Sequence, residues 1–122
     1  MNIKATEPSL TLTDGDDYEL ILFGALGHKK DFGLRERKRW KRLTNVLLDT
    51  YSEAVDERTT FDTPLGMEHT IAGEDAKFVL KAIRGYVDKI LATPEPFSYE
   101  LQSAALGLDV LDMAKATTTD QT

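Results

Sequence analysis

The stretch RERKRWKRLTNVLLDTYSEAV, residues 35–55, decides the fold class of this chain. Its apolar residues recur at intervals of three and four positions, which places them on one face of an α-helix. The residues of this face are Trp40, Leu43, Leu47, Tyr51 and Ala54. Asp31 is a suitable N-cap, and the helical pattern continues to about Arg58. We therefore predict one long helix over about residues 31–58.

A shorter helix is predicted before this stretch. It begins at the turn TLTDGDD, where Asp14 can act as the N-cap, and it ends at Gly27. The apolar run LILFGAL lies within residues 18–27. Apolar residues would lie on nearly every side of such a helix, so their spacing does not distinguish a buried helix from a buried strand. A short strand or extended segment near residues 9–23 therefore stays open as the alternative.

Two more helices follow a predicted loop over residues 59–73. The first starts near Gly73 and ends before the prolines of ATPEPF. Its predicted buried face consists of Ala76, Val79, Ile83, Tyr86, Val87 and Ile90. The second starts at Ser98, a good N-cap, and its predicted buried stripe consists of Leu101, Ala104, Ala105, Leu108 and Leu111. Four helices with short links indicate an all-α fold, a small four-helix bundle-like domain.

The chain length and composition suit one soluble domain. Its 122 residues are enough for a single hydrophobic core. We predict a polar leader over residues 1–13, a single helical domain over residues 14–116 and a flexible polar tail over residues 117–122. The absence of cysteine excludes disulfides, zinc–thiolate sites and thiol nucleophiles. With no signal-peptide pattern and no apolar run that could span a bilayer, we expect a cytoplasmic protein without membrane contact.

Positive charge is concentrated in residues 28–42, here called the basic segment. It holds eight Lys or Arg and two acidic residues, so it carries +6; the rest of the chain carries −12, because the total is −6. On the predicted helix, Trp40 lies within about 20° of the core direction set by Leu47, whereas Lys38 and Arg42 point away from it. Trp40 is therefore expected in the core or at its boundary rather than as a platform for stacking bases.

The order of charges along this helix opposes the helix dipole, because the basic residues come first and acidic residues follow. Either acids of the same chain offset the basic turns, namely Asp14, Asp16, Asp17 and Glu19, or an acidic partner does. An ordinary solvated helix face is the third interpretation. The predicted partner-binding residues are Lys29, Lys30, Arg35, Lys38, Arg39, Lys41 and Arg42.

Nucleic acid is the alternative partner for the basic helix over residues 35–42. An isoelectric point of about 4.9 argues against it, because proteins that bind phosphate backbones usually have a basic domain. The predicted helix is also too long for a helix-turn-helix, and its basic residues surround it. A protein partner is therefore preferred.

A second apolar face is available for association with a partner or with another copy of the chain. Phe78, Leu106, Val110 and Met113 point away from the predicted core stripes. Such second faces are often interfaces in small bundles. These four residues form the predicted apolar interface, and self-association is one expected use of it.

No sequence pattern for catalysis, metal binding or cofactor binding is present. DGDDYE fails as a calcium loop, because Glu19 stands where the loop needs glycine and Ala25 occupies the twelfth position. The two histidines lie in separate predicted loops without the spacing of metal ligands. An acid–base pair of His69 with Glu68 or Asp62 is the arrangement that would suit a small enzyme. We predict no catalytic residue, no metal and no cofactor.

The sequence thus predicts a small, acidic, non-enzymatic interaction protein, either a regulatory or adaptor protein or a small subunit of a larger assembly. Its basic helix face would bind an acidic surface on a protein partner. Two alternatives stay open: a nucleic-acid-binding protein that uses residues 35–42, and a small enzyme with a site around His69. In composition the chain resembles small host-directed proteins of phages and plasmids.

Overall fold

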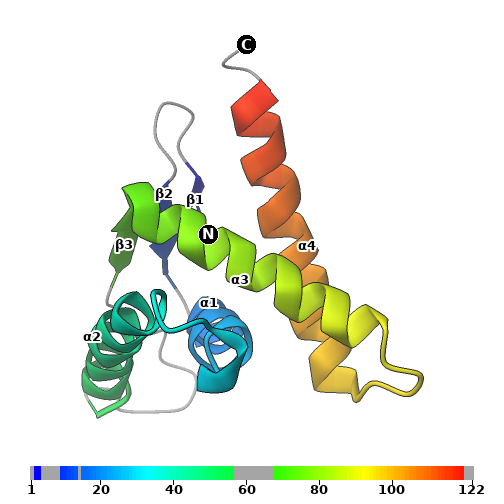
Figure 1. Ribbon diagram of the computed structural model, residues 1–122, viewed down its shortest axis with the longest axis horizontal. Coiled ribbons are helices and arrows are strands. Elements are labelled where there is room, and N and C mark those ends of the chain that lie inside the picture. Colours follow the sequence, from blue (N-terminus) through cyan, green and yellow to red (C-terminus); the bar gives the residue numbers. More distant parts are fainter. Residues whose placement is uncertain (1, 4–8, 14, 57–67, 120–122) are drawn as a thin grey trace.

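The computed structural model describes residues 2–3, 9–13, 15–56 and 68–119 of the chain (Figure 1). Its elements in chain order are β1 Asn2–Ile3, β2 Ser9–Leu12, α1 Gly15–Tyr18, η1 Glu19–Ala25, η2 Lys29–Asp31, α2 Arg37–Asp56, β3 His69–Ala72, α3 Gly73–Leu91 and α4 Ser98–Thr119. Here η1 is a π-helix and η2 is a single turn of 3-10 helix. The protein is a small, mostly α-helical domain with a small sheet, which confirms the predicted helical fold.

Within the described residues the sheet has three antiparallel strands in the order β1-β2-β3. Leu10 of β2 pairs with Ile71 of β3, and the side chains of Leu10 and Leu12 are wholly buried. The segment that the sequence predicts as a polar leader therefore contributes to the core. The predicted extended segment is present at residues 9–12, whereas residues 15–25 are helical.

Strand β3 lies within the predicted loop over residues 59–73. In the described part of this loop, residues 69–72 pair with β2, and only Ile71 of the four is buried. A four-residue strand with one buried side chain gives too short an alternation to identify from sequence. Residues 57–67 lie outside the described residues.

Helix α2 begins at Arg37, later than the predicted start at Asp31. Phe32 is extended, with φ −112° and ψ 137°, and its buried ring packs on Phe78 with 5.3 Å between the ring centroids. An extended residue cannot continue an α-helix, so the burial of Phe32 separates η2 from α2. The 20 residues of α2 are also fewer than the 22 of α4, so the predicted long helix is not the longest one described.

Helix α3 crosses the molecule and packs against η1 and α4 (Figure 1). Its Val79, Ile83 and Val87 are buried, as the sequence predicts. The contact with α4 depends on Gly107, where a Cβ atom would lie 2.6 Å from Cγ2 of Val87. Such a distance is shorter than real contacts allow, so the absence of a side chain at Gly107 brings the two helices together.

Strand β3 passes into α3 without an intervening loop. Ala72 is still extended, with φ −132° and ψ 164°, and Gly73 follows with a φ of 62°. This left-handed conformation is one that glycine adopts at little cost. Gly73 therefore turns the chain from strand into helix within one residue.

The buried face of helix α4 only partly matches the predicted stripe. Ala104 is buried and Leu111 is partly buried, as predicted, whereas Leu101 and Leu108 are 50% and 41% exposed. Gly107 and Val110, outside the predicted stripe, are buried. Apolar residues occur on nearly every side of this helix, so their spacing does not select a face; close packing on α3 favours the small side chains instead. The helix continues to Thr119 and so includes part of the predicted tail, of which residues 120–122 lie outside the described residues.

Candidate binding surface

The basic segment starts as the irregular stretch after η1 and continues into the first turns of α2. The backbone carbonyl of Gly33 accepts hydrogen bonds from the amides of Glu36 and Arg37, and the carbonyl of Glu36 accepts one from the amide of Trp40. The Nε–H group of Arg37 donates to the carbonyl of Phe32 at 3.3 Å. These bonds fix where α2 starts, and they orient the basic side chains that follow.

Trp40 points toward the core, as predicted. Its Nε1–H group donates a hydrogen bond of 2.9 Å to the backbone carbonyl of Leu26, and its ring lies 6.5 Å from that of Phe32 between centroids. The side chain is half-buried and packs against the core cluster. Because its polar atom has a partner and its ring is covered on one side, Trp40 is a boundary residue of the core.

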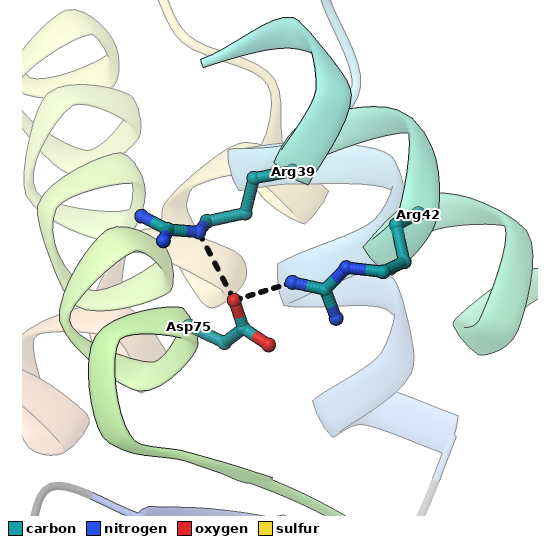
Figure 2. A network of polar contacts seen from close by, with 3 residues as sticks. All are labelled: Arg39, Arg42 and Asp75. Atoms are coloured by element: carbon teal, nitrogen blue, oxygen red, sulfur yellow. Dashed lines mark hydrogen bonds and ion pairs between the residues drawn. The ribbon is translucent and has the colours of Figure 1, made fainter. Parts of the chain in front are cut away.

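Two arginines of α2 bind one carboxylate of α3 (Figure 2). Oδ1 of Asp75 lies 2.6 Å from Nη2 of Arg42 and 3.1 Å from Nε of Arg39. The hydrogen bond from Arg42, together with the positive charge of both arginines, lowers the pKa of Asp75 below its usual value. Asp75 also stands in the first turn of α3, where negative charge interacts favourably with the helix dipole.

Asp75 was not among the acids predicted to offset the basic segment. Of the predicted acids, Asp14 lies outside the described residues. Asp17 accepts hydrogen bonds from the amide and hydroxyl groups of Thr13. Asp16, Asp17 and Glu19 line a separate cleft of about 300 Å³ against α4. Asp75 is far from the basic segment in sequence. An acidic residue in the first turn of a helix is explained by the helix dipole alone, so nothing in the sequence indicates a contact with α2.

The predicted partner-binding residues divide into two groups. Arg39 and Arg42 are engaged with Asp75. The other five are exposed, and none of them makes an ion pair in the part of the chain that the structure describes; they are Lys29, Lys30, Arg35, Lys38 and Lys41. We call these five residues the free cations.

A cleft of about 350 Å³ lies beside the basic segment, between α3 and the chain from η1 to the start of α2. Aromatic rings of Phe32, Phe78 and Tyr86 line it. Charged side chains also border it, and they are Asp31, Glu36, Lys81 and Lys89. Cavities with apolar, aromatic walls and a few polar groups are typical of binding sites. We call this cavity the aromatic cleft.

Side chains of α2 contact residues that line the aromatic cleft. The guanidinium carbon of Arg39 lies 6.0 Å from the centroid of the Phe78 ring, within the range of a cation–π contact. Phe32 contacts both Phe78 and Trp40. On the border, Nζ of Lys89 forms an ion pair of 3.2 Å with Asp31. The first turns of α2 therefore support the wall of the cleft from behind.

The predicted apolar interface is wrong for at least two of its residues. Phe78 and Val110 are buried in the core, and Leu106 is partly buried against it. Met113 is 39% exposed. Phe78 was misassigned because it lies beside the main stripe of α3, where Phe32 covers it.

The arrangement expected for a small enzyme has no support in the described residues. His69 is half-buried on the edge strand β3, and burial, which penalises the charged imidazolium, lowers its pKa. It lines neither of the two clefts described above, and Glu68 is exposed. Asp62 lies outside the described residues.

Comparisons of the chain with protein-family models, with curated proteins and with solved structures gave no match. In the described parts of the chain, no group of three or more His, Cys, Asp or Glu side chains could hold a metal ion. No described helix is long and apolar enough to cross a membrane. Any functional proposal therefore rests on the geometry of the basic segment and the aromatic cleft.

Proposed function

We propose that this protein is a non-enzymatic interaction protein, a regulatory or adaptor protein or a small subunit of an assembly, that binds an acidic surface of a protein partner through its free cations. One observation carries the proposal. In a chain with a net charge of −6, five exposed cations occur within residues 29–41, and none of them has a carboxylate partner in the described residues.

The energetics of α2 support this proposal. Its first turn contains Arg37, Lys38 and Arg39 and no acidic residue. A misplaced charge in a terminal turn costs about 0.3–1 kcal/mol at low ionic strength. Asp75 offsets this cost for Arg39, but Lys38 has no counterpart among the described residues. Recognition of an acidic partner explains why positive charge is retained at this position.

The experiment reverses the charge of three free cations, one just before α2 and two in its first turns. In the triple variant Arg35→Glu, Lys38→Glu and Lys41→Glu, the bonds of Arg39 and Arg42 to Asp75 stay intact. We expect the variant to be at least as stable as the wild type, because a glutamate at position 38 suits the helix dipole. Loss of binding would then not result from unfolding.

Partners are captured from a host lysate on the wild type and on the triple variant and identified by mass spectrometry; each is then purified and its affinity measured by calorimetry. The proposal expects an acidic protein whose affinity falls at least tenfold for the triple variant. The single variant Arg84→Glu changes an exposed cation of α3 outside the basic segment and is expected to bind normally. Equal affinity of the wild type and the triple variant for every captured partner would contradict the proposal.

Nucleic acid competes for the same cations and is tested separately. If five phosphates were bound by the free cations, the logarithm of the affinity for duplex DNA would fall with the logarithm of the salt concentration with a slope of about −4.5. We expect no retardation of duplex DNA or single-stranded RNA in a gel at low salt. Retardation of a nucleic acid whose affinity shows this salt dependence, and which the triple variant does not retard, would favour nucleic acid over protein as the partner.

A further inference from the structure

We propose that the aromatic cleft is an anchor pocket, which receives one aromatic side chain from an acidic segment of the partner protein. The inference rests on the proposed function and extends it, because it specifies the chemistry of the bound segment. An acidic segment without an aromatic residue would contact the free cations and leave the cleft empty.

The size and walls of the cleft suit a single ring. Its volume of about 350 Å³ is at the low end of the range of about 300–1,000 Å³ that is typical of ligand pockets. Phe32, Phe78 and Tyr86 line it, and aromatic rings pack favourably on one another in offset-stacked or edge-to-face geometry. The close approach of η1 to α3 completes the wall, since a Cβ atom on Gly24 would lie 2.7 Å from the ring of Tyr86.

The charges around the cleft favour acidic residues on both sides of that ring. Lys81 of α3 lines the cleft and has no ion-pair partner among the described residues. On the other side, Lys29 and Lys30 directly precede Asp31, and Arg35 precedes Glu36. A bound segment with acids flanking its aromatic residue therefore meets positive charge in both directions.

One of the two acids on the border, Glu36, favours an aromatic ring rather than a carboxylate inside the cleft. Asp31 is neutralised by Lys89. Glu36 lines the cleft, and its Oε1 accepts a hydrogen bond from the amide of Gly33 at 3.4 Å. A carboxylate placed inside would face Glu36, whereas an uncharged ring would not. A buried aromatic anchor with a charged periphery is the usual arrangement of an interface hot spot.

Gly85 allows the cleft to be filled without disturbing the fold. It lies in α3 and lines the cleft, and a Cβ atom placed on it meets no other heavy atom within 4 Å. Leucine at this position would occupy the space proposed for the ring. Alanine would add one methyl group and leave most of the space free, so Gly85→Ala is the matched control for Gly85→Leu.

The experiment measures the binding of two synthetic peptides, Glu-Asp-Glu-Phe-Glu-Asp-Glu and the same peptide with alanine in place of phenylalanine. Calorimetry gives the affinities at about 0.1 M salt, where screening within about 10 Å limits the repulsion from distant acids. Trp40 is the only tryptophan of the chain and contacts Phe32, so its fluorescence reports on the cleft wall. Neither peptide contains tryptophan or tyrosine, which keeps this signal specific.

We expect the phenylalanine peptide to bind at least tenfold more tightly than the alanine peptide and to change the fluorescence of Trp40. The variant Gly85→Leu is expected to remove this difference, and Gly85→Ala to preserve it. Lys81→Glu should weaken the phenylalanine peptide, whereas Arg84→Glu, outside the cleft, should not. The triple variant of the free cations should weaken both peptides.

Four results would overturn the inference. If the two peptides bound with equal affinity and the triple variant weakened both, the result would support binding through the free cations and contradict the anchor pocket. An affinity difference that persists in Gly85→Leu would place the ring elsewhere. Phenylacetate binding as tightly as the phenylalanine peptide would show that the cleft takes a free aromatic acid. Absence of binding by either peptide at millimolar concentration would also contradict the anchor.

Discussion

Asp75 connects α2 to α3 through Arg39 and Arg42, with side chains that remain partly exposed to solvent (Figure 2). Ion pairs at a surface contribute at most about 1 kcal/mol each, because water screens them. We expect Asp75→Asn to lower the free energy of unfolding at pH 7 by about 1 kcal/mol, measured by urea denaturation. An unchanged unfolding midpoint would mean that the arginines find equivalent interactions with water.

The pH dependence of this difference follows from the lowered pKa of Asp75. A carboxyl group whose folded-state pKa is lowered stabilises the protein above its unfolded pKa, about 3.9, and loses this contribution as the pH falls through the folded-state value. The stability difference between the wild type and Asp75→Asn should therefore be full at pH 7 and decrease as the pH falls below about 3.9. A difference that does not decrease in this range would contradict the assignment.

His69 gives a pH dependence of the same direction at higher pH, because burial lowers its pKa. The unfolded chain then binds a proton more readily than the folded one, so stability is present above the unfolded pKa of about 6.5 and falls as the pH drops below it. We expect His69→Gln to flatten the stability profile between about pH 7 and pH 5. Equal slopes for the wild type and the variant, in urea denaturation across this range, would show that His69 is protonated without cost.

At the scale of helices and strands, the sequence predicts which helices form better than it predicts where they begin or which of their faces is buried. The spacing of apolar residues identifies α2 and α3, because each has one broad apolar face and a polar remainder. It fails for α4, where Leu101 and Leu108 are as apolar as the buried Val110. The start of α2 depends on the burial of Phe32, a tertiary contact that no local pattern contains.

The same limit applies to the candidate binding surface. The free cations and the inward position of Trp40 follow from helical geometry applied to the sequence. The contact of Asp75 with Arg42 joins residues that are 33 positions apart, so local spacing could not have identified it. The aromatic cleft likewise combines η1, η2 and α3, and only the packing of these elements creates it.

Two glycines in helices give opposite predictions for the same substitution. Gly85→Ala should raise stability by about 0.5–1 kcal/mol, because alanine is the better helix former and space is available. Gly107→Ala should lower it by about 1–3 kcal/mol, because the new methyl group would overlap Val87 and force the helices apart. Thermal unfolding of both variants checks the pair. A stabilised Gly107→Ala would contradict the close contact of α3 and α4.

At the scale of the whole molecule, the start of the chain is part of the structure and not an appendage. Leu10 is wholly buried in the core, whereas Thr11 is half-buried and its hydroxyl group lies 3.1 Å from that of Thr70. We expect Leu10→Ala to cost about 2–5 kcal/mol in unfolding free energy, as core truncations do. The control Thr11→Ala should cost less than about 1 kcal/mol. If both variants lost less than about 1 kcal/mol of unfolding free energy, this segment would not contribute to the core.

The direct passage from β3 into α3 at Gly73 has a consequence for changes in chain length. An α-helix turns by about 100° per residue. One residue inserted between Ala72 and Gly73 would therefore either rotate α3 by that angle or force the strand to slip. In the first case Asp75 would turn away from Arg39 and Arg42, and Gly85 would turn away from the cleft. Insertions and deletions should be tolerated in the exposed turn before α4 and rejected at this joint, because the strand sets the rotational phase of the helix.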